Sequence, residues 1–387
     1  MLEEHSTRGR AAPYAPKRWR GVWLVGLALA VGCSDDGLGG GVAASGDVAQ
    51  TDGPRYGLHD ADSLEQPDHV APPDAASETS DVPSVPDAAP PAAKGPPYPV
   101  VLAHGFFGTD SFGGLDFATY FYGVRDDLAK HGESLVLTPA VDPFNNSEAR
   151  GAQLRDAILA YLEQTGHAKA IVIGHSQGGL DARFVAATRP DIVAAVVTYA
   201  TPHKGSVVAD VSLGAVSWPG VKQVVDALMN LAGVQVWHSL TGESSLSAAI
   251  EQLSTAKMEA FNAAYPNHPD VAYFSLTGRS ALALAKSECK PDLLVDFLIP
   301  YESVVDPLDP MFYATREVID GGWWKALPHD GLVRVEDARW GTFLGCVPAD
   351  HLDEIGHLFG DWPGGFNSFD HKKLFRDLVG FLRARGY

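Results

Sequence analysis

Three short apolar runs in the middle of the chain have the pattern of strands that are buried on both faces. They lie at residues 99–103, 171–173 and 192–199, and the second run is entirely β-branched. Between the first two runs, apolar residues recur at helical spacing over residues 153–165, and Gly166 is placed to end that helix. This alternation predicts an α/β fold with a mostly parallel central sheet flanked by helices.

The second run leads into the sequence GHSQG at residues 174–178, after which apolar residues return to helical spacing. The change from strand to helix predicts a tight corner, and Gly174 and Gly178 allow strand and helix to approach closely on either side of Ser176. A hydroxyl at such a corner lies at the positive end of the helix and can act as a nucleophile. An ordinary glycine-rich turn is the alternative, and the flanking strand and helix favour the nucleophile.

Residues 206–260 interrupt the alternation with loops and helices, and a helix near residues 221–232 has one apolar face. We interpret this insertion as a lid whose apolar face opens at a lipid surface. An amphipathic helix that stays packed on the domain fits the same periodicity equally well.

The first 97 residues differ in composition from the rest. Residues 1–20 are rich in basic side chains, and residues 21–32 form an apolar run too short to cross a bilayer easily, which predicts a signal peptide over residues 1–32. A short N-terminal membrane anchor is the alternative. Residues 33–97 are acidic, rich in Pro and Ala and nearly free of aromatic residues. We therefore expect a disordered tether there, and a folded domain over residues 98–387.

Composition and charge narrow the class of protein. The chain has 387 residues, of which 45% are apolar and 20% charged, as is typical of a globular protein with a substantial core. The formal charge of −19, without a basic cluster beyond the N-terminal segment, argues against nucleic acid as a partner. The three cysteines lack the spacing of a metal site, and their odd number leaves one outside any single disulfide.

Six motifs, in order along residues 98–359, resemble those of the bacterial family I true lipases, the pseudomonad-type triacylglycerol lipases. The motifs are YPVVLAHGFFG at 98–108, RGAQL at 150–154, IGHSQGG at 173–179, TPHKGS at 201–206, HDGLV at 329–333 and HLDEIGHLFG at 351–360. The resemblance implies an α/β-hydrolase fold with a helical lid, and a serine hydrolase that cleaves acylglycerol esters at a lipid interface. A carboxylesterase or phospholipase of the same fold, acting on soluble or phosphorylated esters, is the alternative.

The resemblance also assigns catalytic roles. It implies a triad of Ser176, Asp330 and His351, and an oxyanion hole formed by the backbone N–H groups of Phe106 and Gln177. Without the resemblance, the order nucleophile, acid, histidine of α/β-hydrolases requires only a late acidic residue followed by a histidine. Several residues then remain possible for each role. These alternatives are Asp320 and Glu336 for the acid, and His357 and His371 for the base. Intact candidates at all three positions argue against an inactive binding module.

A structural calcium ion accompanies the histidine loop in the resembled family. The resemblance places its two carboxylates at Asp306 and Asp353, and its main-chain oxygens at His357 and Asp361, in keeping with the preference of calcium for six or more oxygen ligands. The alternative for Asp353 is that it only caps the helix starting there. No organic cofactor is implied, whereas many members of the family need a dedicated membrane-bound foldase as a partner.

The predicted export of the protein suggests a role for each of the three cysteines. The sequence AVGC at residues 30–33 resembles the lipobox of bacterial lipoproteins, although Ala30 stands where that family prefers Leu. This resemblance predicts acylation of Cys33 and an exported protein held at the cell surface or outer membrane, or a secreted one if no lipid is attached. Export and cysteine arithmetic then leave Cys289 and Cys346 as a disulfide pair. The resembled family often has one disulfide, at a different place.

Overall fold

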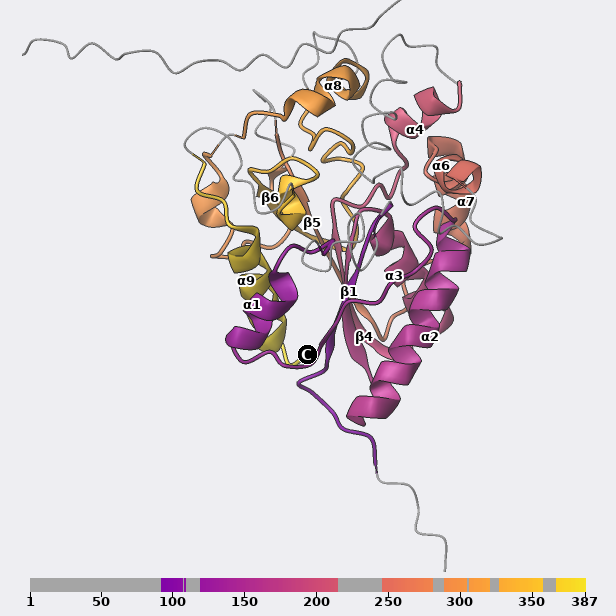
Figure 1. Cartoon of the computed structure of the whole chain (residues 1–387), viewed down its shortest axis with the longest axis vertical. Helices are drawn as coiled ribbons and strands as arrows, with labels where there is room; N and C mark the ends of the chain where they lie inside the picture. Colours follow the sequence, from indigo (N-terminus) through magenta and orange to yellow (C-terminus); the bar gives the residue numbers. More distant parts are fainter. Residues whose placement is uncertain are drawn as a thin grey trace, which may run out of the picture. The chain divides into compact units, whose positions relative to one another are not determined.

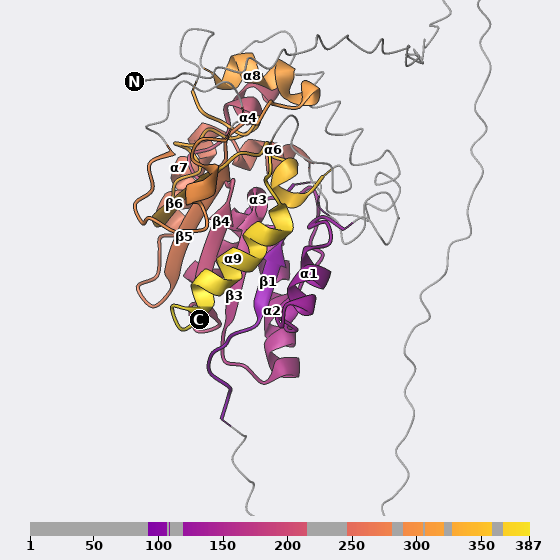
Figure 2. The ribbon, with the colours of Figure 1, turned by 90° about the vertical axis from the view of Figure 1, so that its left-hand side faces the viewer.

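The computed structural model describes the chain from residue 92 onward, with gaps (Figures 1 and 2). The described residues are 92–106, 108, 119–214, 246–280, 289–304, 306–320, 327–357 and 367–387. The predicted signal peptide, Cys33 and most of the predicted tether lie outside this set. Among the described residues, no helix has the length and apolar character needed to cross a membrane.

A parallel sheet forms the centre of the described domain, which confirms the predicted architecture. Its six strands have the order β2-β1-β3-β4-β5-β6, and every neighbouring pair is parallel. The strands are β1 (Val100–Ala103), β2 (Val136–Leu137), β3 (Ala170–His175), β4 (Val193–Tyr199), β5 (Ala272–Gly278) and β6 (Thr342–Val347). The three predicted strands are β1, β3 and β4, which are adjacent in the sheet, so their carboxyl ends meet at one edge.

Helices cover both faces of this sheet (Figure 1). Leu374 and Phe375 of α9 and Leu128 of α1 pack on one face, whereas Leu154 of α2 and Val185 of α3 pack on the other. Figure 2 shows α9 and α1 lying together across the first of these faces. The helices are α1 (Val124–Lys130), α2 (Ser147–Thr165), α3 (Gln177–Thr188), α4 (Val207–Ser212), α6 (Leu246–Gln252), α7 (Thr255–Ala264), α8 (Tyr313–Ile319) and α9 (His371–Arg383).

Helix α2 shows how local sequence sets the bounds of an element. Its N-terminus is capped by Asn146, whose side chain accepts a hydrogen bond from the backbone N–H of Ala149. Its C-terminus is capped by Gly166, which has a left-handed φ of 73° that a glycine adopts without strain. The predicted helix ended correctly at residue 165 but began six residues too late, because the prediction followed the apolar stripe and overlooked the asparagine cap.

The predicted insertion lies between β4 and β5. Its described parts are α4, α6 and α7, and Met258 and Phe261 of α7 pack against Leu180 of α3. Residues 215–245, which include the predicted apolar helix at 221–232, lie outside the described residues. The prediction of a lid therefore stays a prediction.

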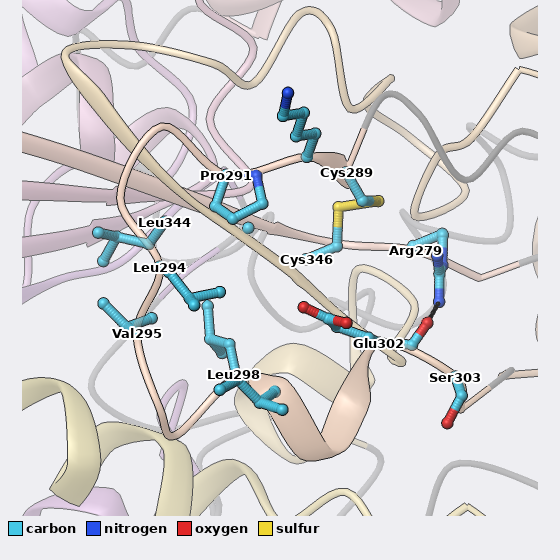
Figure 3. Close-up of a pocket in the computed structure, with 13 residues that line it drawn as sticks. Arg279, Cys289, Pro291, Leu294, Val295, Leu298, Glu302, Ser303, Leu344 and Cys346 are labelled. Carbon is cyan, nitrogen blue, oxygen red and sulfur yellow. Dashed lines mark hydrogen bonds between the residues drawn. A yellow bond between two sulfur atoms is a disulfide. The ribbon is translucent and has the colours of Figure 1, made fainter.

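The edge strand β6 is joined to the preceding segment by the predicted disulfide, which the structure confirms between Cys289 and Cys346. The bond lies in the wall of a pocket of about 340 Å³ that is also lined by Leu294, Leu298 and Arg279 (Figure 3). No residue of the predicted triad lines this pocket. The disulfide thus fastens the outer edge of the sheet, close in sequence to the predicted catalytic histidine.

Candidate active site

Ser176 occupies a strained corner between β3 and α3. Its φ of 54° and ψ of −129° lie in a region that side chains rarely adopt, at a cost of roughly 1–3 kcal/mol. A Cβ atom on Gly174 would lie 2.3 Å from the carbonyl oxygen of Gly178, and one on Gly178 would lie 2.2 Å from that of Ala103. The glycines therefore make room for strand and helix, as predicted, and also for the end of β1.

Asp330 and His351, the predicted acid and base, are brought together by loops after β5 and β6. His351 Nδ1 lies 2.8 Å from Asp330 Oδ2, and its backbone N–H donates to the Asp330 carbonyl oxygen. The second carboxylate oxygen of Asp330 accepts the backbone N–H groups of Leu332 and Val333 at 2.8 and 2.7 Å. Asp330 is fully buried, so these bonds hold its carboxylate in one orientation toward the imidazole.

The alternative acids and bases have other contacts. Asp320 lies 3.3 Å from His329 and from Arg316, and Glu336 is exposed. His357 Nε2 lies 2.9 Å from the carbonyl oxygen of Thr119, and His371 Nε2 lies 2.8 Å from that of Tyr122. Of these candidates, the structure pairs only Asp330 with His351.

The imidazole of His351 stands beside the serine corner. Its ring centroid lies 4.6 Å from that of His175, the residue before Ser176. The partly exposed Ser176 side chain forms no hydrogen bond with His351 in this structure. A hydrogen bond between nucleophile and base often forms only when substrate is bound, and the ring of His351 beside His175 places the candidate base next to the candidate nucleophile.

The loop after β1 passes directly against the same corner. A Cβ atom on Gly105 would lie 2.7 Å from the Cβ of Ser176, so glycine is needed for this approach. Phe106 follows in this loop, and Gln177 is the first residue of α3. The two predicted oxyanion donors thus belong to backbone segments that meet at Ser176.

Arg150 is hydrogen-bonded to the loop after β1. Its guanidinium donates to the carbonyl oxygens of His104 at 2.6 Å and Gly105 at 3.3 Å, and its Nε donates to Asp181 at 2.8 Å. Arg150 and Asp181 are fully buried, and burial raises the pKa of Asp181 to about 6. Arg150 belongs to the RGAQL motif, and no role was predicted for it. A cation at the start of an otherwise apolar helix face was the signal.

Three buried carboxylates lie close to the histidine loop. One ligand atom from each of Asp306, Asp350 and Asp353 lies within 4.8 Å of the others. Both carboxylate oxygens of Asp306 are buried, and the neighbouring side chains of Ser280 and Asn367 form no hydrogen bond of normal geometry with them. Burial is the main cause that raises the pKa of Asp306 to about 7, that of Asp350 to about 8 and that of Asp353 to about 9. Such a cluster lacks positive charge and suits a divalent cation.

The sequence did not predict a role for Asp350. The contacts of Asp350 also correct the alternative that Asp353 only caps the helix starting there. Asp350 Oδ1 accepts the backbone N–H groups of Leu352 and Asp353, so Asp350 binds the free donors at the start of the short 3-10 helix Asp353–Ile355. Asp353 is the first residue of that helix and follows its N-cap residue, Leu352. His357, predicted to supply a main-chain oxygen, lies at the end of the same loop, and Asp361 lies outside the described residues.

Comparisons with known proteins agree with the fold. A family model described as alpha/beta hydrolase fold matches residues 98–254. The chain is 36% identical over 321 residues to a triacylglycerol lipase of Pseudarthrobacter phenanthrenivorans, covering 75% of this chain and 97% of that one. It is 32% identical over 285 residues to a triacylglycerol lipase of Vibrio cholerae serotype O1, covering 68% of this chain and 81% of that one.

A solved structure, EstA from Clostridium botulinum, has the same fold. It is similar with a TM-score of 0.51 at 18% identity, over 76% of this chain and 88% of that one.

We predict that Arg150→Met lowers the free energy of unfolding by about 3–5 kcal/mol, because it leaves the Asp181 carboxylate buried without its cation. The loss grows as pH rises. Arg150 lowers the pKa of Asp181 in the wild type, so without Arg150 that pKa lies further above its unfolded value and the variant loses more stability than the wild type as pH rises. Urea unfolding at pH 5 and pH 8 measures both effects.

The matched control is Arg155→Met, which removes an exposed pair with Asp156 from the same helix. We expect a change below about 1 kcal/mol there. Equal effects of the two substitutions would contradict the importance of the buried pair.

Proposed function

This chain belongs to the triacylglycerol lipase family of α/β hydrolases and is therefore an ester-cleaving enzyme, and we propose that it hydrolyses acylglycerols at a lipid interface through Ser176, His351 and Asp330. The observation that carries the proposal is the contact between His351 and Asp330 beside the strained serine corner. A nucleophile, a base and an acid on three separate loops at one sheet edge are the groups that acyl transfer needs.

Acyl transfer starts when Ser176 Oγ attacks the ester carbonyl carbon and His351 Nε2 takes the hydroxyl proton. Asp330 accepts the Nδ1 proton of the imidazole in a hydrogen bond, which selects the reactive tautomer and stabilises the imidazolium that forms. The backbone N–H groups of Phe106 and Gln177 bind the developing oxyanion, and each lowers the barrier by about 3 kcal/mol. His351 then protonates the leaving alcohol, and a water molecule releases the fatty acid by the same steps.

The proposed substrate class distinguishes a lipase from the esterase alternative. The relatives named triacylglycerol lipase support the lipase, and so does the insertion between β4 and β5. A soluble-ester hydrolase uses the same triad, so the test compares substrates as well as variants.

We expect purified protein to cleave long-chain triacylglycerol emulsions faster than soluble short-chain esters, and Ser176→Ala to lower both rates by roughly 10⁴-fold or more. Ser134→Ala, an exposed serine before β2, serves as the control and keeps full activity. Titration of released acid measures the rates. Faster cleavage of the soluble esters would favour the esterase, and activity left intact in Ser176→Ala would refute the nucleophile.

We extend the proposal to a structural calcium ion held by Asp306, Asp350 and Asp353. The buried carboxylates and the unpartnered oxygens of Asp306 support it. Asp353 lies two residues after His351, so an ion there would fix the loop that carries the base. The ion would supply positive charge for the cluster and take no part in acyl transfer.

We predict that a chelator lowers the melting temperature more at pH 9 than at pH 5. Without the ion, the three carboxyl groups have raised pKa values between about 7 and 9. The folded state then binds protons more tightly than the unfolded state, so its stability falls as pH rises through this range. A bound calcium ion would replace those protons and so prevent the loss of stability at high pH.

Asp353→Asn should weaken the response to calcium, whereas the exposed Asp270→Asn should not change it. Melting curves recorded with calcium and with EDTA test both variants. Identical melting curves of the wild-type protein at pH 9 with calcium and with EDTA would refute the proposed calcium site.

We further propose that Cys33 carries a lipid and that residues 34–97 tether the enzyme to a membrane surface. The AVGC sequence at the end of the apolar run and the acidic, Pro-rich composition support this. Mass spectrometry of the mature protein should find a diacylglycerol adduct on an N-terminal Cys33, absent in Cys33→Ser. An unmodified cysteine would show that the enzyme is secreted without an anchor.

A further inference from the structure

Behind the triad lies a line of buried polar side chains that acyl transfer does not use. The Tyr120 hydroxyl lies 2.8 Å from His175 Nδ1, and His175 Nε2 lies 2.7 Å from Glu354 Oε2. Tyr120 is 7% exposed, and His175 and Glu354 are fully buried. Buried polar groups are costly unless each finds a partner, so this line is a specific feature of the fold.

The Tyr120 hydroxyl also reaches the loop after β1. A Cβ atom on Gly105 would lie 2.5 Å from the phenol oxygen, so the hydroxyl lies directly against the backbone of Gly105. A hydroxyl has one proton to donate and lone pairs to accept with. Tyr120 can therefore accept from Gly105 while it donates to His175.

These two contacts join the segments that supply the oxyanion donors. Gly105 precedes Phe106, and His175 lies two residues before Gln177. In the tautomer with its proton on Nε2, His175 accepts from the phenol through Nδ1 and donates to Glu354 through Nε2. Burial lowers the pKa of His175, in keeping with a neutral ring that has one N–H. A single hydroxyl thus sets the spacing between the loop after β1 and the corner after β3.

We propose that Tyr120 is a positioning residue for the oxyanion hole, an inference that rests on the proposed ester hydrolysis. Its hydroxyl holds the N–H of Phe106 in register with the N–H of Gln177, so that both point at one developing oxygen atom. Charge develops on that oxygen only in the transition state. Loss of the hydroxyl therefore lowers kcat and leaves substrate affinity unchanged.

Tyr120→Phe isolates the hydroxyl, because the ring keeps its edge contacts with Phe121 and its tilted contact with His104. We expect kcat for a soluble p-nitrophenyl ester to fall about ten- to a hundredfold, below the effect of removing an oxyanion donor outright, with KM within twofold of the wild-type value.

The matched control is Tyr199→Phe. The Tyr199 hydroxyl is buried close to His175 and has no hydrogen-bond partner among the described residues. Its removal should leave kcat unchanged. Melting temperatures of both variants show whether either loses its fold. Equal kcat values for the two variants, or a rise in KM that accounts for the loss in Tyr120→Phe, would overturn the proposal.

A boronic acid that mimics the tetrahedral oxyanion separates positioning from general loosening. Its affinity for Tyr120→Phe should fall by the same factor as kcat/KM, whereas a merely structural role would leave the two unrelated. The wild-type enzyme and Ser176→Ala test the hydrolase itself. Wild-type turnover combined with an unaffected Tyr120→Phe would reject the role of Tyr120 and leave the proposed function standing.

Discussion

The arrangement depends on the close approach of three backbone segments at one point. The ends of β1 and β3 and the start of α3 meet around Ser176, and Gly105, Gly174 and Gly178 leave out the side chains that would otherwise collide. The parallel order of β1, β3 and β4 brings these ends to the same edge of the sheet. The strain at Ser176 persists because the surrounding helices and strands leave its backbone no alternative conformation. The close approach of β1, β3 and α3 therefore packs the sheet and also exposes the nucleophile at its end.

Buried polar groups then fix the loops that packing alone would leave loose. Arg150 binds the carbonyl oxygens of the loop after β1, and the Tyr120 hydroxyl lies against the backbone of Gly105 in the same loop. Asp330 orients the imidazole through one oxygen while its other oxygen is held by backbone N–H groups. In a low-dielectric interior such bonds are strong when complete and costly when broken. The site is therefore held by a few polar contacts, each of which a single substitution removes.

The sequence predicted the centre of this arrangement better than its periphery. Strands β1, β3 and β4 were predicted because a central parallel strand is apolar on both faces, and Ser176 because glycines flank a change from strand to helix. Strand β2 has only two residues and β6 lies at the edge, so neither has a distinctive pattern. Asp350 was missed because its role depends on two other aspartates, one of them distant in the sequence, and only the fold brings Asp306 to it. The part played by Tyr120 likewise becomes visible only in three dimensions.

The histidine loop shows why the remaining elements are needed. His351 lies four residues beyond β6, outside any strand, so its position depends on contacts with distant parts of the chain. The disulfide at Cys346 fastens the strand before it, and Asp330 holds the imidazole itself. Asp353, two residues after it, belongs to the carboxylate cluster, whose mutual repulsion would open the loop unless protons or a cation neutralised it. Burial raises the pKa of Asp350 to about 8 and that of Asp353 to about 9, so protons can neutralise these two groups near neutral pH, whereas at alkaline pH the proposed calcium ion would be the group that does so and holds the loop of the base in place.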